Sequence, residues 1–230
     1  MKEKRELINN ILKGLIVLTM FFGFSPLLLG ILDYLNVDLS NFSLTTRVMI
    51  VALTEVLLMV YFFIIYKQDL KKYFLDLKKN KSSYFEIALK WWITGLIVMA
   101  SANLLIRFFT PSEIAGNEEI VRDLVKAVPW YMLFSAAVYA PFVEEIAFRK
   151  VFKDIFKNPA IFIVFSGLAF GLIHVYASAG SIIDYLYVIP YGALGAAFAY
   201  AYHKTNNLLV PMSMHFVHNG LLMIIYLLTL

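Results

Sequence analysis

The chain alternates between long apolar runs and short polar segments, and each run is near the roughly 20 residues that an α-helix needs to cross a bilayer. A backbone inside lipid has to satisfy its own hydrogen bonds, so runs of this length predict helices. Seven such runs occur, over residues 14–32, 48–66, 87–106, 130–150, 160–177, 185–202 and 206–230. The pattern predicts an all-α fold, a polytopic transmembrane bundle of about seven helices.

The first run follows a basic start of the chain, as in a secretory signal peptide. Its apolar stretch over residues 14–32 exceeds the roughly 7–15 residues of a signal h-region, and no small-residue cleavage site follows it. We therefore expect this run to be retained as the first membrane helix.

Composition supports a membrane protein and excludes several kinds of chemistry. Hydrophobic residues make up 61% of the chain, charged residues make up 16%, and the mean hydropathy is +0.75. Soluble proteins carry roughly 25% charged residues, so a water-soluble fold is excluded. Because the chain contains no Cys, disulfides, thiolate nucleophiles and Cys-ligated metals are excluded as well.

The net charge of +4 would point to nucleic acid only if the basic residues formed one patch. They instead fill alternate connecting segments, at residues 2–5, 67–81 and 150–157 and at Lys204, while the other connections are acidic or neutral. The positive-inside rule then predicts a multi-pass protein of the cell membrane with a cytoplasmic N-terminus, an external C-terminus and no nucleic-acid partner. The amphipathic segment 111–128 is expected to lie along the outer surface.

Ionisable residues inside the apolar runs are candidates for function, because each costs at least ~2.5–3.5 kcal/mol in hydrocarbon. Glu55 stands alone in the second run, and we assign it no chemistry, since a structural hydrogen-bonding role is an equally good interpretation. The other candidates form three motifs on three later runs. These are E-E-x-x-x-R (Glu144, Glu145, Arg149), F-x-x-x-H (Phe170, His174) and H-x-x-x-N (His215, Asn219).

The three motifs are expected to meet in one layer of the bundle. Within each motif, residues at i and i+4 lie about 40° apart around the helix axis and share one face. We count from turns predicted near residues 156–158 and 204–205. The first Glu, both motif His and the Asn then lie roughly 16–26 Å deep at 1.5 Å per residue.

The two adjacent glutamates are expected to have different environments. Neighbouring residues on a helix point about 100° apart, so Glu144 and Glu145 cannot face the same surroundings. Glu145 and Arg149 lie on a common face, where an ion pair offsets much of the cost of burying either charge. We therefore expect Glu145 to pair with Arg149 and Glu144 to face the polar layer.

Small residues predict where the helices pack closely. Gly167 and Gly171 form a G-x-x-x-G face on the fifth run, and Gly192 and Gly195 contribute to similar faces on the sixth. Such faces let helix backbones approach one another in lipid. We interpret these positions as packing sites without a chemical role.

Together and in this order, the motifs resemble the CAAX prenyl protease and bacteriocin-processing (CPBP, or Abi) family of intramembrane proteases. The resemblance covers about residues 130–230. It implies that residues 129–230, with four predicted membrane helices, form the catalytic core. The three predicted membrane helices and connecting loops over residues 1–128 resemble the family only in being hydrophobic. The resemblance also implies that the protein cleaves peptide bonds in membrane-associated peptides or proteins.

The family resemblance assigns Glu144 and His174 to the activation of water, and His215 and Asn219 to the oxyanion hole. The chemistry can also be argued from the residues, because peptide hydrolysis needs a base for water, donors for the oxyanion and a proton for the leaving amine. Glu144 can act as base and then as acid, and His174 can orient the water. His215 and Asn219 lie one turn apart and can donate to one oxygen.

Three alternatives accompany this interpretation. A catalytic zinc ion could be held by Glu144, His174 and His215, although the remaining amide, Asn219, suits an oxyanion better than a metal. A bacteriocin-immunity or regulatory membrane protein could keep the motifs without cleaving anything. Intramembrane carboxylates and histidines also build proton relays in transporters, but the odd helix number and the missing inverted repeat weigh against transport.

One further histidine lies close to the third motif. His218 is about 300° around the helix axis from His215. This angle puts His218 on a different face from His215, and we interpret it as a packing or interfacial residue.

Overall fold

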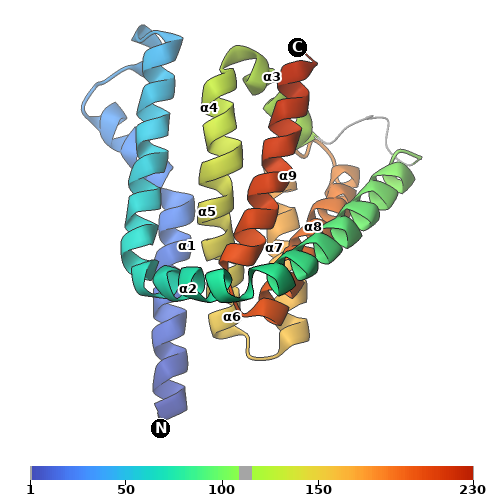
Figure 1. Ribbon diagram of the computed structural model, residues 1–230. Coiled ribbons are helices and arrows are strands. Elements are labelled where there is room, and N and C mark those ends of the chain that lie inside the picture. Colours follow the sequence, from blue (N-terminus) through green and yellow to red (C-terminus); the bar gives the residue numbers. More distant parts are fainter. Residues whose placement is uncertain (1, 109–115, 230) are drawn as a thin grey trace.

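The computed structural model describes residues 2–108 and 116–229, and within these ranges every regular element is helical (Figure 1). The predicted all-α fold is confirmed. In chain order the elements are α1 (Lys2–Tyr34), the 3₁₀ turn η1 (Leu39–Asn41), α2 (Leu44–Ile106), α3 (Gly116–Ala127), α4 (Pro129–Phe134), the π-helical segment η2 (Ser135–Tyr139), α5 (Ala140–Glu144), the π-helical segment η3 (Glu145–Lys150), α6 (Val151–Ile155), α7 (Pro159–Tyr176), the 3₁₀ segment η4 (Ile183–Tyr187), α8 (Val188–Thr205) and α9 (Leu209–Leu228).

Five helices in the described part of the chain are long and apolar enough to cross a membrane. They are Lys2–Tyr34, Leu44–Ile106, Pro129–Ile155, Pro159–Tyr176 and Leu209–Leu228. They contain six of the seven predicted runs, because α2 includes both the second and the third. The chain is therefore a multi-pass membrane protein.

The helix of the remaining run, α8, lies inside the bundle. Its Phe198, Ala199 and Ala201 are fully buried, so protein rather than lipid surrounds much of its surface. Small residues, rather than bulky apolar side chains, line the contact between α8 and its neighbour α7. A Cβ added at Gly167 would lie 2.8 Å from the carbonyl oxygen of Gly192, and one at Gly171 would lie 2.5 Å from that of Val188. The predicted packing role of these small residues is confirmed.

The lysine-rich segment 67–81 is helical, so its prediction as a loop was wrong. It contains no Gly or Pro, and its many Lys residues suit a helix that lies at a membrane surface. Only Asn80, with φ −114° and ψ 17°, leaves the helical region within α2. In Figure 1, α2 first stands beside α1, then runs across the base of the bundle, and finally rises at an oblique angle.

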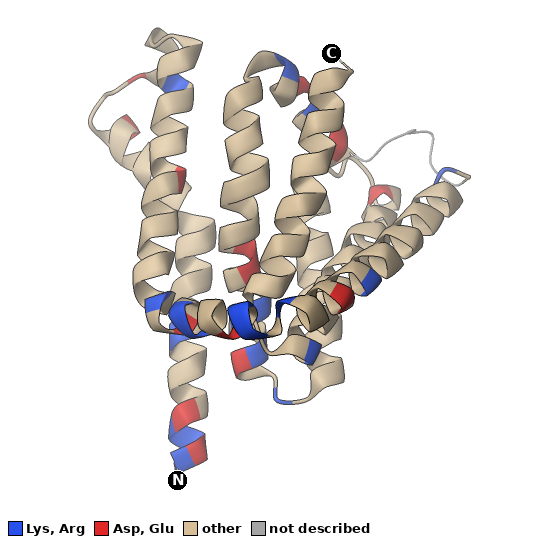
Figure 2. Cartoon of the chain, viewed as in Figure 1, with Lys and Arg blue, Asp and Glu red and all other residues tan. Residues whose placement is uncertain are grey.

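The ends of the described chain lie at opposite ends of the bundle (Figure 1). Lys and Arg gather at the N-terminal end and around the level where α2 crosses the base (Figure 2). This distribution is the one that the positive-inside rule requires. The assignment of this end to the cytoplasm stays a prediction.

Two π-helical segments interrupt the helix that carries the first motif. Proline has no N–H to donate, so Pro141 leaves a carbonyl of the preceding turn without its helical partner. In η2, the Ala140 N–H donates to the Ser135 carbonyl five residues earlier. The next bond of that kind would reach the Ala136 carbonyl from Pro141, which cannot make it. Such π-turns are rare and often occur at functional sites.

Candidate active site

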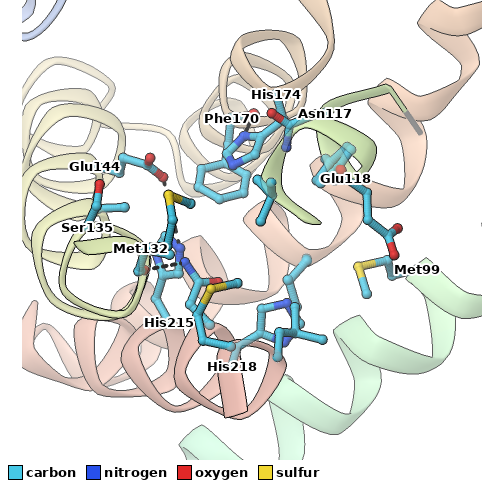
Figure 3. A pocket seen from close by; sticks show the side chains of 18 of the residues that line it. Met99, Asn117, Glu118, Met132, Ser135, Glu144, Phe170, His174, His215 and His218 are labelled. Carbon is cyan, nitrogen blue, oxygen red and sulfur yellow. Dashed lines mark hydrogen bonds and ion pairs between the residues drawn. The ribbon is translucent and has the colours of Figure 1, made fainter. Parts of the chain in front are cut away.

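A cavity of about 500 Å³ opens among the helices and is lined by Glu144, His174, His215 and Asn219 (Figure 3). The structure therefore brings together the four residues that were predicted to share one layer. They come from α5, α7 and α9. Glu145 and Arg149 are not among the residues that line it.

Glu144 faces the cavity from the last position of α5. Its side chain is 14% exposed, and Oε2 lies 4.0 Å from Nε2 of His215. Among the described residues, this Oε2 has no hydrogen-bond partner. The orientation predicted for Glu144 is confirmed, and its carboxylate keeps an oxygen able to accept a proton.

Glu145 turns away from the cavity into a fully buried ion pair. Its Oε2 lies 3.1 Å from Nε of Arg149, and both side chains are 0% exposed. Nη2 of Arg149 donates to the Gly195 carbonyl at 3.3 Å, and its guanidinium carbon lies 4.3 Å from the centre of the Phe170 ring. The predicted Glu145–Arg149 pair is confirmed.

His215 connects the buried pair to the cavity. Its Nδ1 lies 3.0 Å from Oε1 of Glu145, while its Nε2 faces Glu144 at 4.0 Å. The ring is 2% exposed and lies between Phe170 and Phe198, with ring centres 5.6 Å and 5.4 Å away. An apolar enclosure of this kind fixes the direction of both ring nitrogens.

His174 is held by the backbone of its own helix. Its Nδ1 lies 2.8 Å from the Phe170 carbonyl, and a carbonyl oxygen can only accept, so Nδ1 carries the hydrogen. In the neutral ring, Nε2 is then an acceptor. Stacking against Tyr191, with ring centres 4.9 Å apart, keeps the ring in this orientation.

Asn219 uses the carbonyl that Pro141 leaves free. Its Nδ2 donates to the Ala136 carbonyl at 2.7 Å, which joins α9 to the π-helical segment η2. One of the two amide hydrogens makes this bond, and the second stays available for another acceptor. Pro141 therefore contributes to the position of Asn219 through a backbone group, a connection that the sequence pattern does not reveal.

The alternative zinc site is not assembled in this arrangement. Within residues 2–108 and 116–229, no three His, Asp or Glu side chains are grouped as a bound metal ion would require. This applies to the set considered from the sequence, Glu144, His174 and His215.

His218 and Glu55, to which the sequence analysis assigned no chemistry, have different surroundings in the structure. His218 lines the same cavity although it lies on a different face of α9 from His215, because the cavity spans more than one face of this helix. Glu55 is a structural partner, as one interpretation held, and accepts hydrogen bonds from Tyr131 at 3.0 Å and Ser135 at 2.7 Å.

The N-terminal half also contributes to the cavity wall. Met99 and Asn103 come from α2, and Asn117 and Glu118 come from α3. The helix α3 forms the regular part of the segment predicted to be amphipathic, of which residues 111–115 lie outside the described residues. No local motif marks these positions, because only the tertiary fold brings them to the site.

Comparison with known proteins bears on the same region. The family model described as type II CAAX prenyl endopeptidase Rce1-like matches residues 126–221. The Bacillus subtilis (strain 168) protein YdiL, named as a candidate membrane peptidase, is 24% identical over 159 residues, or 66% of this chain. The Staphylococcus aureus (strain USA300) protein MroQ, named as a membrane-embedded CAAX protease, is 27% identical over 164 residues, or 67% of this chain.

The aligned regions span 62% and 63% of the lengths of these two relatives. No solved structure matches the chain. The resemblance to the CAAX prenyl proteases is confirmed over residues 126–221, the part that holds all three motifs.

Proposed function

We propose that this chain is an intramembrane endopeptidase that cleaves membrane-associated peptides or proteins within the bilayer. The observation that carries the proposal is the convergence of Glu144, His174, His215 and Asn219 on one cavity. The match to the CAAX prenyl endopeptidase model over residues 126–221 supports the same conclusion.

The first step of the proposed reaction is activation of water by Glu144. A water molecule between Glu144 and His174 would give one proton to Oε2 of the carboxylate, while Nε2 of His174 would accept its second hydrogen in a hydrogen bond. The resulting hydroxide attacks the carbonyl carbon of the peptide bond. Glu144 then returns its proton to the amide nitrogen and the C–N bond breaks, which gives an amine and a carboxylic acid that afterwards releases its own proton to water.

His215 and Asn219 would stabilise the oxygen that becomes negative in the transition state. As an oxyanion donor, His215 would carry a hydrogen on Nε2, while its Nδ1 lies 3.0 Å from Oε1 of Glu145. This hydrogen on Nε2 would point to the cavity. A single donor of this kind contributes about 2.7–4 kcal/mol to transition-state stabilisation.

Cleavage is tested with purified protein in detergent and a library of membrane-spanning peptides. The proposal expects peptide products from the wild-type protein that are absent with Glu144→Ala. Comparison by mass spectrometry of membrane peptides from cells with each form would then identify natural substrates. Solute uptake into proteoliposomes without any peptide cleavage would favour the transport alternative, and neither activity would favour a non-catalytic immunity or regulatory protein.

A further inference from the structure

The cavity extends beyond the four residues that the proposed reaction uses, and His218 lies in its wall. In Figure 3, His218 and Glu144 lie at different sides of the cavity. The His218 side chain is 8% exposed, so it belongs to the interior of the bundle. Burying a polar ring without a hydrogen bond carries a free-energy cost, so such a ring usually has a hydrogen-bond partner or a function.

One nitrogen of His218 is bound by a residue from the N-terminal half. Nε1 of Trp92, on the oblique part of α2, lies 3.4 Å from Nδ1 of His218. The indole N–H can only donate, so Nδ1 has to accept. His218 is therefore held as the neutral tautomer that carries its hydrogen on Nε2. Among the described residues, no hydrogen bond is formed by this Nε2.

The apolar part of the cavity lining favours a neutral ligand group. Its residues come from three helices, with Met99 on α2, Leu194 on α8 and Leu222 on α9. A peptide backbone that enters such a region loses water around its carbonyl groups, and each unpaired carbonyl carries a desolvation cost. A neutral N–H donor satisfies a carbonyl without the larger cost of burying a charge.

We propose that His218, held in one tautomer by Trp92, is a substrate-positioning residue that donates from Nε2–H to a backbone carbonyl of the bound peptide. This inference rests on the proposed function. It gives α2 a role in the site, because Trp92 lies on this helix and outside the region matched by the family model.

Peptide binding tests the inference separately from cleavage. The probe is a fluorescently labelled, leucine-rich transmembrane peptide, titrated against detergent-solubilised protein carrying Glu144→Gln, so that the peptide stays intact. Adding His218→Phe should raise Kd about 2- to 12-fold, the equivalent of one neutral hydrogen bond. His218→Gln keeps an N–H donor and should recover most of the affinity. Phe216→Leu, at a half-exposed position on the same helix, is the matched control.

Trp92 provides a second, independent test. Trp92→Phe removes the indole N–H that holds His218 in one tautomer, so it should raise Kd less than His218→Phe does. The two substitutions together should weaken binding no more than His218→Phe alone. In cleavage assays with protein that keeps the native Glu144, His218→Phe should raise KM and leave kcat unchanged.

The possible results separate the two proposals. An unchanged Kd for His218→Phe, an equal loss for His218→Gln, additive effects with Trp92→Phe, or no binding of the peptide at all would overturn the positioning role. If the wild-type protein cleaves no peptide while the predicted Kd changes appear, the proposed protease function fails and the role of His218 stands.

Discussion

Removing the charge of Glu145 should destabilise the protein, because Arg149 would then be buried without a counter-charge. The ion pair is 3.1 Å long and both side chains are fully buried, and breaking such a pair from one side costs about 3–5 kcal/mol. In Glu145→Gln, the amide oxygen can still accept from Nδ1 of His215, which places the expected loss near the lower value, about 3 kcal/mol.

The assay is thermal unfolding of purified protein in detergent. For a chain of this size, 1 kcal/mol shifts Tm by about 2–4 °C, so Glu145→Gln should lower Tm by about 6–12 °C. Glu86→Gln, at an exposed position on α2, is the matched control and should leave Tm unchanged. Adding Arg149→Met to Glu145→Gln should recover part of the loss, because removing both members of a buried pair often costs less than removing one.

Two results would refute this reasoning. An unchanged Tm for Glu145→Gln would mean that the buried guanidinium does not depend on this carboxylate. A double variant less stable than Glu145→Gln alone would mean that the other contacts of Arg149, with the Gly195 carbonyl and the Phe170 ring, matter more than its charge balance.

Three further predictions concern topology, metal and packing. Reporters fused after Lys79 and Lys157 should read cytoplasmic and one fused after Leu230 external, and a cytoplasmic C-terminus would contradict the seven-crossing topology. Cleavage should survive strong chelation, whereas loss of activity with recovery on adding zinc would establish a metal mechanism. Gly171→Leu should cost at least about 1–3 kcal/mol, measured as lower Tm, because its Cβ would meet backbone of α8. The control Gly30→Leu, with nothing within 4 Å, should not.

The periodic features of the sequence predicted much of the fold. Membrane helices have to be about 20 apolar residues long, so six of the seven runs coincide with helices that are apolar enough to cross the bilayer. The continuity of α2 was missed, because charged residues were interpreted as a loop although a helix at a membrane surface carries them equally well. The segment 67–81 lacks the Gly or Pro that ends a helix.

The site was predicted only as far as local spacing reaches. The i, i+4 motifs correctly placed Glu145 beside Arg149 and Glu144 in the cavity, because both follow from the geometry of one helix. The contributions of Met99 and Glu118 depend on how α2 and α3 pack against the core, and no local pattern encodes that contact. The position of His218 in the cavity wall was not predicted, because helix geometry gives its direction relative to His215 but not the width of the cavity.

The role of Glu144 as the base is the central claim, and its most direct test is the cleavage rate of Glu144→Gln measured beside Glu145→Gln. Glutamine keeps the size of the side chain but cannot take a proton from water. We expect Glu144→Gln to be abundant, to have the Tm of the wild-type protein and to form no product. Glu145→Gln should lose stability as much as turnover. Near-normal turnover by Glu144→Gln, with Glu145→Gln folded and inactive, would contradict this claim and would assign the base to the other glutamate.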